Sequence, residues 1–476
     1  MKKRILTLVA VLALLCLTAV TAASCVSNNN RETQPPVDTN ESVFETESET
    51  DVETDAGTAT ETQPETQPET ETYWRPTVQS SELNELMQSI FVGTTVRNET
   101  VMFLDKGETK GLLYPIKEIV SVTSFNGQTT YVEGVDYEVV DGKLKVLAGS
   151  SIPCITSNTY NNGGDGTITL NGQKLYWGEN LMQKWQVCVN YTHDTTWEGY
   201  AQACEGRVYQ DFLKKLDAGE DVTIIFYGDS ITYGACSGWI ANIQNGAYVD
   251  PTFSADQAPY SILFTQALAD LFDYTVHYVD YSHLQTVGSN GKPLTGAPKV
   301  PTADYVAGER GTITYINTSE GGEGTFNAAK NKKLNDFIVE PATTYGCDLL
   351  VIAYGMNDGG TSNLSSGFKK IMNAVWDVEP DCSVMMVSSM MPHPNAATWD
   401  GEQKNQEPYL RELAVTMQKN GKNVAVACVN SVTKAILENK DFYDFAGNNI
   451  NHPNDFLHRI YAQTLLQAMI GYENMQ

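Results

Sequence analysis

A serine in a glycine-flanked turn is the first residue of this chain that could carry out chemistry. Ser230 stands in Gly-Asp-Ser-Ile, directly after the apolar run 222–227. In a parallel sheet, ligands bind beyond the carboxyl ends of the strands, so such a serine is well placed to attack a substrate. Its hydroxyl is a weak nucleophile and needs a base to accept the proton. The alternative is a turn serine that only caps the next helix.

Three further motifs follow Ser230 along the chain. A glycine-rich stretch lies at 317–322, Gly-Met-Asn-Asp lies at 355–358, and Asn-His-Pro-Asn lies at 451–454. Together with Gly-Asp-Ser-Ile, in this order, they resemble the four blocks of the SGNH, or GDSL-type, serine hydrolase superfamily. The resemblance spans about residues 222–470.

This resemblance implies a role for a residue of each block. Ser230 would be the nucleophile and His452 its base. The backbone N–H groups of Ser230 and Gly322 and the side-chain amide of Asn357 would form the oxyanion hole, in which each donor is typically worth about 3–4 kcal/mol of transition-state stabilisation. Gly321 or Gly324 could replace Gly322. A plain surface loop at the glycines and an ordinary turn at the asparagine are the structural alternatives.

The chain departs from the family pattern at the residue that orients the base. The family has an aspartate three residues before the histidine, where this chain has Asn449. One solution is a Ser-His pair oriented by a backbone carbonyl, an asparagine or water. The other uses Asp455 and His458, which match Asp-x-x-His, although an acid at Asp455 is also explained by the dipole of the helix that it begins.

Other histidines and metal chemistry are weaker candidates. His393-Pro-Asn copies the tripeptide of the fourth block but does not precede the final helix. His452, Asp455 and His458 could ligate a metal, yet their spacing matches no common zinc motif, and paired cysteines are lacking. The sequence also lacks a phosphate-binding loop and a dinucleotide fingerprint. We therefore expect neither a metal nor a cofactor.

The residues around these motifs predict an α/β fold. We expect a flavodoxin-like, three-layer SGNH hydrolase domain with a parallel sheet over 206–476, because apolar runs alternate with helical segments there. The elements expected are strands at 222–227, 276–281, 348–354 and 383–388, and helices at 260–272 and 453–470.

Shorter alternating runs precede this domain. The runs 119–122, 131–137, 144–147 and 185–189 are separated by turn residues. They predict a small antiparallel β-sandwich, jelly-roll-like, over 73–205. A disulfide among Cys154, Cys188 and Cys204 is left open, because no paired-cysteine spacing supports it.

The first 72 residues predict export. Residues 1–24 combine a basic start with a short apolar run, as in a signal peptide, and Cys25 is a lipidation candidate in a lipobox-like context. An ordinary secretory signal is the alternative. The stretch 25–72 is rich in acidic residues, threonine and proline, which predicts an extended, disordered stalk.

The net charge of −27 limits the class of partner. Nucleic acid is not expected, because phosphate binding needs clustered lysine and arginine. Membrane contact is expected only through the lipid anchor.

The layout is similar to that of two-domain bacterial carbohydrate esterases, including carbohydrate esterase family 2. This similarity implies a cell-surface or secreted serine esterase that removes O-acetyl groups from a polysaccharide. Aromatic residues Tyr233, Trp239 and Trp399 could stack on sugar rings. The alternatives are a catalytically degenerate glycan-binding protein and a hydrolase of peptidoglycan or lipid esters.

Overall fold

The computed structural model describes residues 83, 85–162, 166–170, 172–177, 182–238, 258–281, 300–358, 361–396, 403 and 405–471. The expectations for the signal peptide, Cys25, the stalk, Trp239 and Trp399 lie outside the described residues. Residues 73–476 form one compact unit.

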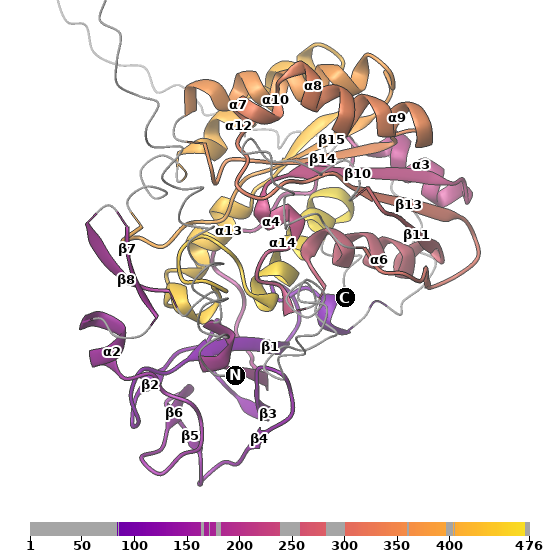
Figure 1. Cartoon of the computed structure of the whole chain (residues 1–476). Coiled ribbons are helices and arrows are strands. Elements are labelled where there is room, and N and C mark those ends of the chain that lie inside the picture. Colours follow the sequence, from indigo (N-terminus) through magenta and orange to yellow (C-terminus); the bar gives the residue numbers. More distant parts are fainter. Residues whose placement is uncertain are drawn as a thin grey trace, which may run out of the picture. The chain divides into compact units, whose positions relative to one another are not determined.

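A seven-stranded sheet forms the centre of this unit (Figure 1). Its order is β12-β11-β13-β10-β14-β15-β16, and all neighbours are parallel except β12 and β11. The strands are β10 (Val222–Gly228), β11 (Thr275–Val279), β12 (Tyr305–Val306), β13 (Thr312–Asn317), β14 (Leu349–Ala353), β15 (Ser383–Val387) and β16 (Val424–Ala427). The chain places β11, β12 and β13 on one side of β10 and then crosses to β14 on the other side. The carboxyl end of β10 is therefore a switch point, where doubly wound sheets bind ligands.

Helices cover both faces of the sheet. Every residue of the apolar strand β10 is therefore buried, on both sides. Ile224 and Phe226 belong to one core, and Ile225 and Tyr227 to the other. In Figure 1, α6 (Tyr260–Phe272) and α14 (Asp455–Ile470) lie on one face. The other face carries α7 (Thr325–Ala328), α8 (Asn331–Leu334), η5 (Asn335–Val339), α9 (Glu340–Tyr345), α10 (Thr361–Trp376) and α12 (Gln406–Lys419). The expected three-layer α/β fold is confirmed.

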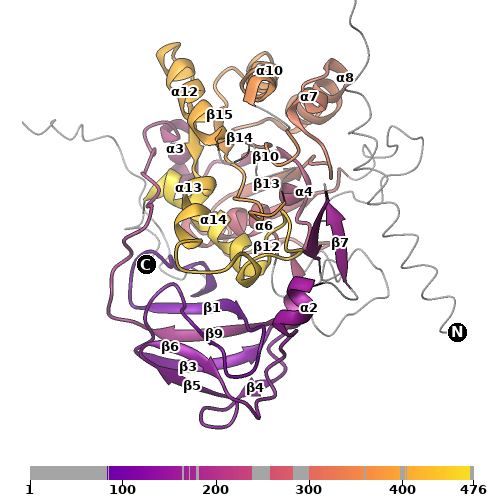
Figure 2. The same cartoon turned by 90° about the vertical axis from the view of Figure 1, so that its left-hand side faces the viewer.

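The β region, residues 83–205, is built mainly from antiparallel strands (Figure 2). One sheet has the order β1-β9-β3-β4 and a second has β2-β6-β5, while β7 and β8 form a hairpin. The strands are β1 (Thr95–Met102), β2 (Thr109–Lys110), β3 (Glu118–Ser124), β4 (Thr130–Tyr131), β5 (Tyr137–Val140), β6 (Lys143–Val146), β7 (Thr167–Leu170), β8 (Gln173–Tyr176) and β9 (Gln186–Thr192). The antiparallel sheets agree with the expected β-type region.

In two expected elements a single residue explains why the bounds differ. The run 131–137 is a strand only at its ends, because it turns at Gly134, whose φ is +78°. The final helix begins at Asp455 rather than Pro453, because Asn454 is extended and accepts the N–H of Leu457 with its side chain. Asparagine is a preferred residue at this capping position.

The β region and the α/β sheet share one hydrophobic core. Val101 of β1 and Val189 of β9 belong to the same buried cluster as Phe264 of α6 and Leu465 of α14. The boundary expected between 205 and 206 stays a prediction. The remaining helices are η1 (Glu85–Met87), α2 (Ser157–Asn162), η3 (Met182–Trp185), α3 (Gln210–Ala218), α4 (Ser230–Tyr233), α13 (Val429–Ile436) and η6 (Phe442–Asp444).

The cysteines of the described residues do not form the pair considered above. Cys154 and Cys188 are free thiols, so neither is joined to Cys204. Cys347 and Cys382 lie with their sulfur atoms 3.5 Å apart at the starts of neighbouring strands. In the described part of the chain, no helix has the length and apolar character needed to cross a membrane.

Candidate active site

Ser230 lies at the carboxyl end of β10, as the first residue of the short helix α4. The side chain of Asp229 caps this helix by accepting the N–H of Ile231 at 2.9 Å. Gly228 lets the turn pack closely, because a methyl group there would collide with the side chain of Thr232 and the carbonyl of Ala353. The backbone N–H of Ser230 is thus at a helix N-terminus, where donors are left unpaired by the helix itself.

His452 meets Ser230 across 222 residues of sequence. The Oγ of Ser230 lies 2.7 Å from the Nε2 of His452, within hydrogen-bond distance. Both side chains are partly buried. The structure therefore brings together the two residues that the first and fourth motifs predicted as nucleophile and base.

Asn448 contacts the other ring nitrogen of His452, a contact that the sequence did not predict. Its Nδ2 lies 2.7 Å from the Nδ1 of His452. Its Oδ1 accepts the N–H groups of Ile450, Asn451 and His452, each at 3.0 Å. The only available sequence signal is the tendency of asparagine to bond backbone N–H groups a few residues ahead.

Asn449 does not orient His452, which corrects the expectation for this position. Its φ of +55° turns the side chain away, and its Nδ2 donates to the hydroxyl of Tyr160 at 2.9 Å and the carbonyl of Tyr176 at 2.8 Å. Both tyrosines belong to the β region. Asn449 therefore anchors the loop that carries the histidine.

Asp455 and His458 also point elsewhere. Asp455 accepts the N–H of Gly238 at 2.6 Å, and burial raises its pKa to about 8. His458 lies near the backbone of Tyr260 and Ala235, with both ring contacts at 3.4 Å. Burial lowers the pKa of His458 to about 3. Neither of the two provides the alternative base or its orienting acid at Ser230.

Two of the predicted oxyanion-hole segments lie near the serine turn. A methyl group added to Gly321 would lie 3.9 Å from the Cβ of Ser230, whereas one added to Gly322 would meet no atom within 4 Å. Gly321 is therefore the better-placed of the two, and the role of Gly322 stays a prediction. Asn357 donates one amide hydrogen to the carbonyl of Glu323 at 3.0 Å, which leaves its second hydrogen available.

The electrostatic surroundings keep His452 neutral. Burial lowers its pKa to about 4. Burial also raises the pKa of Asp229 to about 7, and Asp358 has a raised pKa for the same reason. A neutral imidazole is the form that can accept a proton from a serine.

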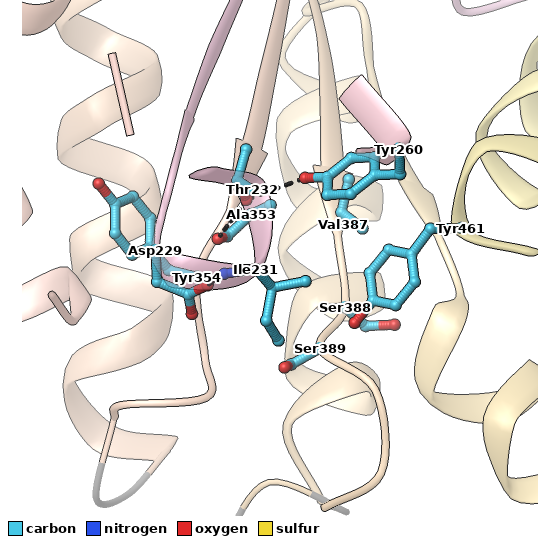
Figure 3. Close-up of a pocket in the computed structure, with 10 residues that line it drawn as sticks. All are labelled: Asp229, Ile231, Thr232, Tyr260, Ala353, Tyr354, Val387, Ser388, Ser389 and Tyr461. Carbon is cyan, nitrogen blue, oxygen red and sulfur yellow. Dashed lines mark hydrogen bonds between the residues drawn. The ribbon is translucent and has the colours of Figure 1, made fainter. Parts of the chain in front are cut away.

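A small cavity lies beneath the serine turn (Figure 3). Its volume of about 10 Å³ is close to the minimum needed for one water molecule. It is lined by Asp229, Ile231, Thr232, Tyr260, Ala353, Tyr354, Val387, Ser388, Ser389 and Tyr461.

The β region holds the histidine segment, which we define as residues 440–454. Gln186 donates to the carbonyls of Tyr443 at 2.7 Å and Ala446 at 2.9 Å. Asn454 donates to the side chains of Gln186 and Thr100. The base is therefore placed by contacts with the β region as well as by the sheet.

Other contacts extend this attachment. Lys440 pairs with Glu99 of β1 at 2.6 Å, and both side chains are fully buried. Asp444 accepts the N–H of Met102 and pairs with Lys110. His393 contacts the histidine segment, since its N–H donates to the carbonyl of Ile450 at 2.8 Å.

The structure also bears on the expectations for sugar stacking and for metal binding. Tyr233 is only 5% exposed and is not available to stack on a sugar. Among the described residues, no group of three or more histidine, cysteine, aspartate or glutamate side chains could hold a metal ion.

Comparison with solved structures finds similarity to several esterases, at low identity and low TM-score. It is similar to a two-domain esterase active on acetylated mannans, with a TM-score of 0.36 and 14% identity over 58% of this chain and 56% of that one. It is also similar to a carbohydrate esterase family 3 protein from Talaromyces cellulolyticus, with a TM-score of 0.31 and 13% identity over 52% and 98%. The lipase/acylhydrolase from Enterococcus faecalis gives a TM-score of 0.32 and 12% identity over 52% and 96%.

The chain thus matches little more than half the length of the two-domain esterase. No family model and no curated protein matches it.

Proposed function

We propose that this protein is a serine esterase that acts through an acyl-enzyme on Ser230. The observation that carries the proposal is the 2.7 Å contact between the Oγ of Ser230 and the Nε2 of His452 at the switch point of the sheet. A hydroxyl and an imidazole in contact beside backbone and amide donors are the elements of acyl transfer.

In the proposed reaction, His452 takes the proton of Ser230 as the Oγ bonds to the ester carbonyl carbon. The resulting oxyanion is stabilised by the N–H of Ser230, a glycine N–H near 321 and the amide of Asn357. His452 then gives its proton to the leaving alcohol as the carbon–oxygen bond breaks. Water, activated by the same histidine, releases the acid and restores the hydroxyl.

The proposed substrate is an O-acetylated polysaccharide outside the cell. The four motifs in order and the β region before the α/β sheet resemble the layout of two-domain carbohydrate esterases, which supports this substrate class. The signal-like residues 1–24 and Cys25 support export and a lipid anchor.

A labelling experiment tests the proposal directly. The full chain should react stoichiometrically with an organophosphate at Ser230 and release acetate from acetylated xylan or mannan. Ser230→Ala and His452→Ala should each lower kcat by at least about 10³-fold. Ser389→Ala, a serine lining the cavity below, should still be labelled and active.

A catalytically degenerate glycan-binding protein is the second candidate, favoured by the amide rather than carboxylate contact on His452. Glycan affinity without labelling or turnover would support it and would exclude the esterase. Release of longer acids, or of acetate from peptidoglycan alone, would exclude the proposed substrate but retain the esterase.

A further inference from the structure

The side-chain amide of Asn448 has only one workable orientation. Its oxygen accepts three backbone N–H groups, from residues 450, 451 and 452. Reversing the amide would place an NH₂ group against those three donors. The hydrogen-bond network therefore fixes the nitrogen toward Asn451 and His452.

This orientation determines which nitrogen of His452 carries the proton. The NH₂ of Asn448 has no acceptor site, so at 2.7 Å the Nδ1 of His452 must be the acceptor. A neutral imidazole then carries its single proton on Nε2. That N–H donates to the Oγ of Ser230, so the ring must move its proton from Nε2 to Nδ1 before it can accept the proton of Ser230 as the general base.

Among the described residues, no carboxylate contacts the ring of His452. Around His452 lie Ser230 from α4 and the neutral asparagines 448 and 451 from its own loop. In α14, the carboxyl of Asp455 accepts a hydrogen bond from the N–H of Gly238, and His458 contacts the carbonyl of Ala235. An imidazolium formed during the reaction would direct its Nδ1–H at the NH₂ of Asn448.

We propose that Asn448 is a positioning residue that holds His452 in the Nε2–H tautomer and so slows the reaction, and that a carboxylate at 448, not at 449, would accelerate it. This inference rests on the proposed esterase function. An acidic group at 448 could still accept the backbone N–H groups with one oxygen and would accept Nδ1–H with the other.

Asn448→Asp in the full chain is the decisive variant. The reverse change in a serine protease, aspartate to asparagine, lowers kcat by about 10⁴-fold through the wrong tautomer. We expect kcat for an aryl acetate to rise at least about 10-fold, with KM little changed. The acid limb of the pH profile should move to higher pH, because a carboxylate stabilises the imidazolium.

Asn449→Asp is the matched control, since it places the carboxylate at the position favoured by the family pattern. Aspartate tolerates the left-handed backbone of this residue, but its side chain would face Tyr160 and Tyr176 instead of the histidine. We expect no rise in kcat and no shift of the acid limb. A gain at 449 with none at 448 would overturn the proposal.

Nitrogen NMR of the imidazole rings tests the tautomer without turnover. The chain has six histidines, and His452→Ala assigns the relevant signal. A proton on Nε2 supports the proposal and a proton on Nδ1 overturns it. If organophosphate labelling and turnover fail in every variant, the esterase function is wrong, while the NMR result still decides the tautomer.

Discussion

The neutral state of His452 is the residue-scale property on which the proposed chemistry depends. Its ring lies against Ser230 and Asn448, and burial lowers its pKa to about 4. An ordinary histidine titrates near pH 6.5 and would be largely charged at pH 5. The surroundings of His452 therefore extend to lower pH the range in which the ring is neutral, the charge state that the reaction requires.

The pH profile of kcat/KM should reflect this shift. Activity requires the deprotonated ring, so we expect it to remain nearly constant from pH 7 to about pH 5 and to fall as the pH drops through about 4. Hydrolysis of an aryl acetate, with circular dichroism at each pH to verify folding, is the measurement. A midpoint near pH 6.5 in a folded protein would show that the ring is solvated and not buried.

The identity of the orienting residue shows where sequence reasoning stops at this scale. Ser230 and His452 were predictable because each lies in a motif at the end of a strand or the start of a helix. The family spacing, three residues before the histidine, predicted Asn449 as the residue that orients His452. The backbone φ of +55° instead directs the Asn449 side chain toward the β region. Such a turn depends on Tyr160 and Tyr176, which lie about 270 to 290 residues earlier.

At the scale of elements, the nucleophile and the base have different supports. Ser230 is fixed by β10 and α4. The histidine segment is fixed by side chains of the β region, with Gln186 of β9 at its centre. Gln186 is 1% exposed, so loss of its amide would leave buried carbonyls without their donor.

Gln186→Ala should therefore lower both stability and kcat. We expect unfolding free energy to fall by about 1–3 kcal/mol and kcat by about 10-fold or more, because small displacements of catalytic groups are costly. Thermal unfolding and aryl acetate hydrolysis are the measurements. Gln418 lies on the distant helix α12 and donates a similar hydrogen bond to the carbonyl of Val424 in β16. Gln418→Ala should therefore lower stability alone. If both variants lowered kcat equally, Gln186 would have no specific role in placing His452.

The elements themselves were predictable to different degrees. Strand β10 and helix α6 match their expected ranges within a residue, because long apolar runs and a helical period leave few alternatives. Strand β1 was not predicted. Its sequence, TVRNETVM, contains Glu99, a charged residue whose burial depends on Lys440, far away in the chain.

At the scale of the whole molecule, the β region and the α/β sheet behave as parts of one compact unit. They share a hydrophobic core and a fully buried ion pair between Glu99 and Lys440. Glu99 also accepts from the N–H of Leu113 and the hydroxyl of Tyr191. Breaking such a pair leaves an uncompensated charge in the interior.

Glu99→Gln should destabilise the whole unit by about 3–5 kcal/mol. Tryptophan fluorescence, which includes Trp185 and Trp197 of the β region, and far-ultraviolet circular dichroism should report one coincident transition. Glu138→Gln breaks the exposed pair with Lys145 and should cost at most about 1 kcal/mol. Two separate transitions in the wild-type protein would instead show that the β region unfolds independently.

Because the histidine segment is attached to the β region, the position of His452 can be disturbed from outside the active site. An antibody or small compound that binds the β region and strains the contacts of Gln186 or Asn449 would pull the base away from the serine without entering the active site. If the proposed esterase function holds, inhibition of that kind would be non-competitive with the ester and would act equally on every ester that the protein hydrolyses.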